Sequence, residues 1–332
     1  MSGERIVVLD DWTRFWSGQP ALDRLRAYGE VVVYDTPAAG QQDVVDRLRG
    51  ATIAFANRER TVLNAPVLRA ADRLRLLAQT GRISPNVDAE TATECGIALI
   101  AAGGQPGSHV GVAELGLALL LALARDIPHN DHRVRTGDWM APPTRMLSGL
   151  TLGILGLGNI GRHMARLAQA LQMEVIAWGP TLTPERAAQS GVRMVGFEEL
   201  FPQLDVLFVS TRLSDMTRGL VGSAQLRAMK PGSYLINIAR GPILDQTALV
   251  EALQRGPLAG AGLDVYDVEP LPVDNPLLKL DNVVLTPHIG WGTDRNFGMM
   301  VDNLTRAVIK FLDGDTSDVV NPDALRRRAA NV

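Results

Sequence analysis

Short apolar runs alternate with segments of helical periodicity along most of the chain. Five apolar runs precede residue 102, and the segments between them place apolar side chains three or four positions apart, the spacing of an amphipathic helix. A second series of six runs begins near Thr151. Strands that alternate with helices favour parallel sheets, so we expect an α/β protein with two doubly wound sheets. The predicted strands cover residues 5–9, 31–34, 52–56, 74–78 and 97–101 in the first series, and 152–155, 175–178, 206–209, 233–237, 260–265 and 283–286 in the second.

Two helical segments differ from the others. Residues 112–125 are apolar on nearly all sides, which predicts a helix buried between layers or between domains. Residues 292–313 have the periodicity of one long helix near the end of the sequence. The arginines at positions 326–328 are most simply a solvated tail. Shorter helices are predicted at residues 21–28, 43–48, 66–71 and 88–94.

Three glycines, Gly156, Gly158 and Gly161, lie between a predicted strand and a predicted helix. Gly156 permits a tight turn, Gly158 has no side chain to block a pyrophosphate, and Gly161 lets the helix pack close to the strand. The amides of Asn159 and Ile160 would then point at the phosphates from the start of the helix, where the helix dipole also favours negative charge. Because a second strand follows the helix, the motif predicts a dinucleotide-binding site.

One expected feature of an NAD site is missing. An acidic residue about 20 positions after the glycines usually binds the ribose 2′-hydroxyl at the end of the second strand. Here that strand ends at Trp178 and is followed by Gly179 and Pro180. Either a backbone or hydroxyl contact, such as that of Thr181 or Thr183, replaces the carboxylate, or the loss of negative charge admits the 2′-phosphate of NADP. We expect measurable use of both NAD and NADP.

Arg240, Glu269 and His288 each follow a predicted strand of the second series. Ligands of open α/β sheets bind outside the carboxyl ends of the strands, so these side chains are expected to converge near the nicotinamide. A planar guanidinium suits bidentate binding of a carboxylate, and a histidine can take and return a hydroxyl proton. A neighbouring carboxylate favours the imidazolium and fixes its tautomer. Each residue alone could be an ordinary loop residue, but together they predict an acid–base site for a carboxylate substrate.

Length and charge restrict the remaining possibilities. A chain of 332 residues is expected to form two domains, and a net charge of −3 without a long basic run argues against nucleic acid and anionic membranes as partners. No signal peptide is recognisable, and the longest apolar stretch is too short to span a bilayer. The single cysteine, Cys95, cannot form an internal disulfide, and we expect a buried thiol in a reducing cytoplasm. We expect no bound metal.

Four further sequence blocks carry a family resemblance. With the glycine motif they have the order and spacing of the D-isomer-specific 2-hydroxyacid dehydrogenases, which the chain resembles over essentially its whole length. Four blocks in this order make the resemblance highly specific. They are Met229-Lys-Pro-Gly232, Asn237-Ile-Ala-Arg-Gly241 followed by Asp245, Leu263-Asp-Val-Tyr-Asp-Val-Glu-Pro270, and Thr286-Pro-His-Ile-Gly290.

The resemblance implies a role for each residue of the charged trio. Arg240 would bind the substrate carboxylate, His288 would be the acid and base, and Glu269 would be its partner. The family also commonly dimerises through the nucleotide domain, so we expect a homodimer. Its architecture implies a Rossmann dinucleotide-binding domain of residues 109–291, inserted in a flavodoxin-like substrate-binding domain of residues 1–108 and 292–332.

The resemblance extends to the cofactor. Asp264, with the backbone at Ile238 and Ala239, would contact the nicotinamide carboxamide, and Thr217 would lie near the ribose. The other positions that we predict at the cofactor, beyond the glycine motif, are Gly179, Ser210, Arg212 and Gly290.

The chain departs from the family pattern at several places. The family usually has two glycines separated by one residue in its substrate loop, whereas this chain has Gly81-Arg82-Ile83. Arg82 would add a second cation there, and the sequence does not define the shape of the pocket. Ser210 and Arg212 stand where the family often has His and Pro, and Arg212 is available for a ribose or a phosphate. Trp291 replaces a smaller residue, and it either lines the substrate pocket or packs the domain interface.

We therefore expect reversible hydride transfer between a nicotinamide cofactor and a small D-2-hydroxy acid or its 2-keto acid. One alternative is a dehydrogenase of another small anion. Formate is disfavoured because that branch pairs its histidine with Gln where this chain has Glu269, whereas phosphite stays open. The other alternative is a dinucleotide-sensing, corepressor-like binding protein. Such proteins are distinguished by appended partner-binding segments, and we expect none here because the sequence has no long tail to carry one.

Overall fold

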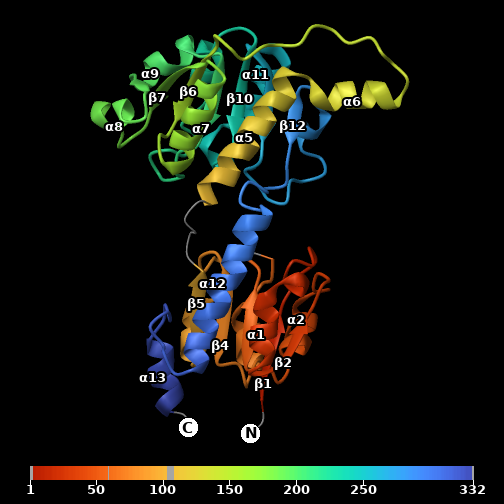
Figure 1. Ribbon diagram of the computed structural model, residues 1–332, viewed down its shortest axis with the longest axis vertical. Helices are drawn as coiled ribbons and strands as arrows, with labels where there is room; N and C mark the ends of the chain where they lie inside the picture. The colour runs from red at the N-terminus through yellow and green to blue at the C-terminus, as the bar shows by residue number, and fades with distance from the viewer. Residues whose placement is uncertain (1–2, 59, 103–107, 331–332) are drawn as a thin grey trace. The chain divides into compact units, whose positions relative to one another are not determined.

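The computed structural model describes residues 3–58, 60–102 and 108–330. The chain divides into two compact units, one of Met1–Pro106 with Asp294–Val332 and one of Gly107–Thr293. Each unit contains one sheet, and every strand pair in both sheets is parallel (Figure 1). The expected α/β class with two parallel sheets is confirmed.

The first unit is built on a five-stranded sheet in the order β2-β1-β3-β4-β5. This is the strand order of a flavodoxin-like doubly wound sheet. All residues of the inner strands β3 and β4 are buried, as expected for a parallel sheet that is covered on both faces. The elements are β1 Glu4–Val8, α1 Pro20–Arg26, β2 Gly29–Val33, α2 Gln41–Leu48, β3 Ile53–Ala56, α3 Ala65–Ala70, β4 Leu76–Thr80, α4 Ala89–Glu94, β5 Ala98–Ala102, α12 Asp294–Leu312 and α13 Asp323–Ala330.

The second unit contains a seven-stranded sheet in the order β12-β11-β10-β9-β6-β7-β8. Read from β8 to β12, this is the strand order of the Rossmann fold with one additional strand at the β12 edge. The sequence predicts six of these strands and misses β8, whose two residues are too short for a visible pattern. The elements are α5 Ser108–Ala124, α6 Ile127–Arg135, β6 Thr151–Leu155, α7 Asn159–Ala170, β7 Glu174–Trp178, α8 Pro184–Ala188, β8 Arg193–Met194, α9 Phe197–Leu200, β9 Val206–Val209, α10 Ser223–Ala228, β10 Ser233–Asn237, α11 Gln246–Arg255, β11 Leu258–Leu263 and β12 Val283–Leu285.

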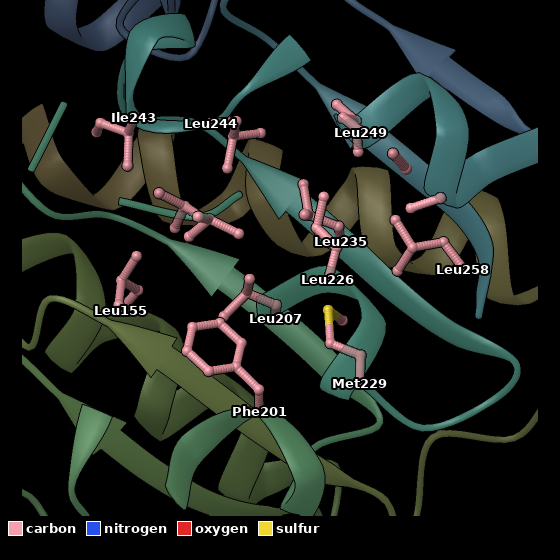
Figure 2. Packing of buried hydrophobic residues seen from close by; sticks show 14 of the residues in the cluster. Leu155, Phe201, Leu207, Leu226, Met229, Leu235, Ile243, Leu244, Leu249 and Leu258 are labelled. Atoms are coloured by element: carbon pink, nitrogen blue, oxygen red, sulfur yellow. The ribbon is translucent and has the colours of Figure 1, made fainter. Parts of the chain in front are cut away.

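One hydrophobic cluster holds the strands that carry the charged trio. Leu207 of β9 and Leu235 of β10 are completely buried in it, together with Leu226 of α10 and Leu249 of α11 (Figure 2). Burial of one such leucine contributes about 1.5–3 kcal/mol. The cluster therefore fixes the carboxyl ends of β10 and β11 on a rigid base.

Helix α5, which the sequence predicts to be buried between layers or between domains, is only partly buried. One face packs on α7 and on β10 and β11, whereas Glu114, Ala118 and Leu121 are exposed. The apolar sequence of a helix shows which of its faces can be buried. It does not show which of those faces the rest of the same chain covers. Among the described residues, no helix combines the length and the apolar character needed to cross a membrane.

After α5 the chain forms α6, which the sequence does not reveal because its residues are mostly polar. It is followed by an irregular segment, residues 136–150, that leads back to β6 and extends beyond the sheet with α6 (Figure 1). Trp139, Met140 and Met146 of this segment are 85%, 82% and 74% exposed. We call α6 and residues 136–150 the arm.

One expectation for the first unit is wrong, and another holds only in part. Cys95 is exposed rather than buried, because it lies at the C-terminal end of the short helix α4. The arginines at 326–328 belong to helix α13, in which Arg326 and Arg327 are solvated as expected and Arg328 is not. Arg328 donates a hydrogen bond to the carbonyl of Leu74 and lies against Gly96, so this helix is attached to the first unit.

Candidate active site

Arg240, Glu269 and His288 follow three adjacent strands, β10, β11 and β12. Because these strands are parallel, their carboxyl ends meet at one edge of the sheet. The turn after β10 is fixed by Asn237, whose amide nitrogen donates to the carbonyl of Arg240 at 3.0 Å. Its side-chain oxygen accepts the amide of Ala239, also at 3.0 Å. The Arg240 side chain is exposed, with Nη1 donating to the carbonyl of Ala239.

Glu269 and His288 form a direct pair. His288 Nδ1 lies 2.7 Å from Glu269 Oε2, and the two side chains are 29% and 34% exposed. The other carboxylate oxygen, Oε1, accepts the amide of Tyr266 at 2.9 Å. Both oxygens of Glu269 are thus engaged, which holds the carboxylate in one orientation toward the imidazole.

The surroundings of Glu269 keep it ionised. Burial by itself raises the pKa of this carboxyl, but the hydrogen bonds from His288 and from the Tyr266 amide lower it. The positive charge of Arg240 acts in the same direction, and the net pKa lies below the usual value. Arg240 follows β10 at the same edge of the sheet and is near enough to contribute to this lowering.

His288 has a left-handed backbone conformation, with φ of 54°, which is uncommon for a residue other than glycine. The loop that contains it is held by Asp264, which is 1% exposed. Asp264 accepts the Thr286 hydroxyl at 2.7 Å, the Ile289 amide at 2.8 Å and the Gly290 amide at 2.9 Å. Sequence reasoning places Asp264 at the cofactor but does not foresee this role in the His288 loop.

Two aromatic residues join the same loop. The indole nitrogen of Trp291 donates to the carbonyl of His288 at 3.0 Å. Trp291 is half-buried, and this bond gives it a part in the backbone geometry of the histidine. Tyr266 lies 8% exposed beside the loop, and the sequence analysis does not single it out.

The glycine turn has the shape that a dinucleotide requires. Gly156 has φ of +101°, and a Cβ there would lie 2.6 Å from the backbone of Thr211. A Cβ at Gly161 would lie 2.4 Å from the carbonyl oxygen of Gly156, whereas a Cβ at Gly158 would enter open space. Helix α7 starts at Asn159 with no side-chain cap, so its first amides are directed to a ligand or to solvent. These features fit a bound pyrophosphate.

The other positions predicted at the cofactor differ in what their side chains do. The hydroxyl of Ser210 donates to the carbonyl of Gly156 at 2.8 Å and braces the glycine turn. Thr217 is 1% exposed, and its hydroxyl donates to the carbonyl of Arg212, so it shapes the loop that carries Arg212. The Arg212 side chain is exposed, Gly179 directly follows β7, and Ile238 is buried after β10.

Gly81, Arg82 and Ile83 belong to the first unit and directly follow β4. Gly81 has φ of +89°, Arg82 is exposed and Ile83 packs partly against the core of that unit. Their part in substrate binding stays a prediction. Sequence reasoning misses Arg60 at the same edge, whose guanidinium lies 4.5 Å from the ring centre of Trp12.

The fold and the site together define a class of protein: a Rossmann unit with an acid–base pair and an arginine at the carboxyl edge of its sheet. Residues 117–290 match the family model described as D-isomer specific 2-hydroxyacid dehydrogenase, NAD binding domain. The chain belongs to this family.

Relatives of known name agree with this assignment. The chain is 38% identical over 288 residues to the D-3-phosphoglycerate dehydrogenase of Archaeoglobus fulgidus, covering 85% of this chain and 54% of that protein. It is 32% identical over 326 residues to the hydroxypyruvate reductase of Blautia hydrogenotrophica, covering 96% and 99%. The structure of phosphoglycerate oxidoreductase from Vibrio cholerae matches with a TM-score of 0.83 at 31% identity, covering 94% and 99%. The chain spans about half the length of the D-3-phosphoglycerate dehydrogenases that it matches.

Proposed function

We propose that the protein transfers a hydride reversibly between a nicotinamide cofactor and a small D-2-hydroxy acid or its 2-keto acid. The observation that carries this proposal is the 2.7 Å contact between His288 and Glu269, at the edge where Arg240 also lies. An acid–base group beside a carboxylate-binding cation, next to a dinucleotide turn, has the parts that this chemistry needs.

The residues divide the chemistry as follows. The nicotinamide ring, when bound, supplies or accepts the hydride. His288 uses Nδ1 to contact Glu269, so Nε2 is the nitrogen that gives a proton to the substrate carbonyl oxygen in reduction and takes it back in oxidation. Glu269 stabilises the imidazolium and fixes its orientation. Arg240 binds the substrate carboxylate, and Gly81, Arg82, Ile83 and Trp291 contribute further contacts around the substrate.

A substrate panel tests this function. Pyruvate, glyoxylate, hydroxypyruvate, 3-phosphohydroxypyruvate and longer 2-keto acids are mixed with NADH or NADPH, and oxidation of the coenzyme is followed at 340 nm. The panel includes the chemistries after which the relatives are named. Turnover of at least one keto acid, with formation of the D-isomer, is expected. Binding of NADH without turnover of any acid would instead favour a dinucleotide-sensing protein.

We propose that both coenzymes are used. No carboxylate follows β7, because the position is Gly179, and Arg212 is exposed and available for a phosphate. A Cβ at position 179 would meet Leu182 at 3.5 Å and Gly156 at 3.7 Å, which is ordinary contact, so an aspartate can be accommodated.

Steady-state constants for NADH and NADPH test the coenzyme proposal. Gly179→Asp is expected to depress NADPH use through repulsion of the 2′-phosphate, and Arg212→Ala to weaken NADPH while leaving NADH unchanged. Complete exclusion of NADPH by the unaltered protein would contradict the proposal.

We also propose that two copies associate through the arm of the second unit. Trp139 and Met140 are large apolar side chains that lie almost fully exposed next to each other in the arm. A second copy of the chain would cover them. A hollow of about 440 Å³ near the arm, lined among others by Pro142, Tyr234 and Val284, provides room for an apolar side chain. Trp139→Glu combined with Met140→Glu is expected to convert dimer to monomer in light scattering. Val273→Glu, at a 96% exposed position outside the arm, is the control.

A further inference from the structure

Tyr266 links the ends of two neighbouring strands through its side chain. Its hydroxyl lies 3.1 Å from the carbonyl oxygen of Leu263, at the end of β11, and 3.0 Å from that of Thr286, just beyond β12. Burial, followed by the negative charge of Asp264, raises the pKa of Tyr266 to about 12. The phenol therefore keeps its proton at any ordinary pH and shares it between the two carbonyls.

The backbone of Tyr266 reaches the remaining parts of the site. Its amide donates to Glu269 Oε1 at 2.9 Å. The loop after Arg240 lies directly on it, since a Cβ at Gly241 would come within 2.0 Å of the Tyr266 carbonyl carbon. One residue thus contacts the Arg240 loop, the carboxylate of Glu269 and the strand end that leads to His288.

We propose that Tyr266 is a positioning residue that sets the distance between Glu269 and His288, an inference that rests on the proposed function of this pair. The amide fixes Glu269 and the hydroxyl fixes Thr286, two residues before His288. A phenylalanine would fill the same space and keep the backbone hydrogen bond from Thr286 to Leu263, but it would lose both contacts of the hydroxyl. The hydroxyl, rather than the ring, is therefore what the proposal tests.

The test is Tyr266→Phe, with Tyr28→Phe as the matched control, because the Tyr28 hydroxyl contacts Asp313 at the surface of the first unit. The melting temperatures of both variants are measured first. Their turnover rates are then compared at a temperature well below the lower of the two melting temperatures. For Tyr266→Phe we expect kcat to fall about five- to tenfold, the loss of a hydrogen bond near the reacting group. The pH profile is expected to shift, with unchanged affinity for NADH. An unchanged kcat and pH profile would overturn the proposal, even if the melting temperature fell.

A second measurement does not depend on turnover. The imidazole titration of His288 is followed by NMR in the absence of substrate, and the signal is assigned by its loss in His288→Gln. Among the described residues, the titratable and charged groups around the pair include Arg240, Asp264 and Tyr266. A titration that moves in Tyr266→Phe but not in Tyr28→Phe supports the inference even if no keto acid is reduced. A titration that stays fixed in a catalytically active protein overturns the inference and leaves the proposed function standing.

Discussion

Asp205 and Asp264 lie at opposite ends of the same seven-stranded sheet, and both are buried carboxylates, at 9% and 1% exposure. Asp205 precedes β9 at the amino end of the sheet. Its carboxylate accepts hydrogen bonds from the side chains of Arg145 and Lys230, each at 2.9 Å, and from the Thr151 amide at 3.0 Å. Asp264 follows β11 at the carboxyl end, and in the described part of the chain its hydrogen-bond donors are two amides and one hydroxyl.

The difference shows what each end is for. At the amino end two cations neutralise the buried charge and attach the end of the arm, through Arg145, to the sheet. At the carboxyl end neutral donors hold the loop that keeps His288 in its left-handed conformation. No ion pair joins Asp264 to a described cation, and Arg240, a cation of that edge, is exposed and can meet a ligand. Changes at the carboxyl end should therefore affect catalysis, and changes at the amino end stability.

His288→Gln is the strongest test of this division. Loss of the acid–base group is expected to lower kcat by roughly 10²–10⁴. The melting temperature and the affinity for NADH, measured by scanning fluorimetry and fluorescence titration, should stay close to those of the unaltered protein. A variant that kept full turnover would show that another group moves the proton.

Arg240→Ala should have the next largest effect. Loss of a hydrogen bond to a charged group costs about 1.5–3 kcal/mol, or roughly 10- to 150-fold in kcat/KM. The loss is expected for every accepted keto acid, because all share the carboxylate. Arg255→Ala, an exposed arginine at the end of α11, is the control. Full catalytic efficiency in Arg240→Ala would remove it as the carboxylate anchor.

Asp205→Asn tests the other end of the sheet. Burial by itself raises the pKa of Asp205, but the Thr151 amide and the charges of Lys230 and Arg145 outweigh it, so the folded-state pKa lies below 3.8. The carboxylate therefore stabilises the fold above the unfolded pKa, and this contribution is lost as the pH falls through the folded value. We expect a loss of about 1–2 kcal/mol at pH 7 that shrinks under acid conditions, with kcat unchanged. Urea melts at several pH values measure it.

Local patterns predict the strands and the glycine turn of this sheet, because a buried strand and a tight turn are each encoded within a few residues. Helix α6 escapes prediction since its apolar residues are too few to form a face. Strand β8 escapes because an edge pairing of two residues leaves no period.

The charged trio is predictable from its place after three strands, but the connections that orient it are not. Hydrogen bonds from the His288 loop to Asp264 cross 22, 25 and 26 positions of sequence, and the one from Tyr266 to Thr286 crosses 20. Nothing local to Asp264 or Tyr266 indicates such partners, because strand pairing alone brings them together. For the same reason sequence reasoning finds the reacting groups more readily than the residues that hold them.

Glu269→Gln is the finest test of the comparison, because it keeps the size of the side chain and removes only its charge. Two donors converge on this carboxylate, His288 Nδ1 and the Tyr266 amide, and a glutamine has one oxygen to offer them. Without the negative charge the imidazolium is less favoured, so it loses its proton at lower pH. Keto-acid reduction, which needs the protonated histidine, should then fail at a lower pH than in the unaltered protein. Profiles of kcat/KM against pH decide the matter, with Glu251→Gln on the exposed side of α11 as the control. Coincident profiles for Glu269→Gln and the control would show that the pair seen in the structure does not govern proton transfer.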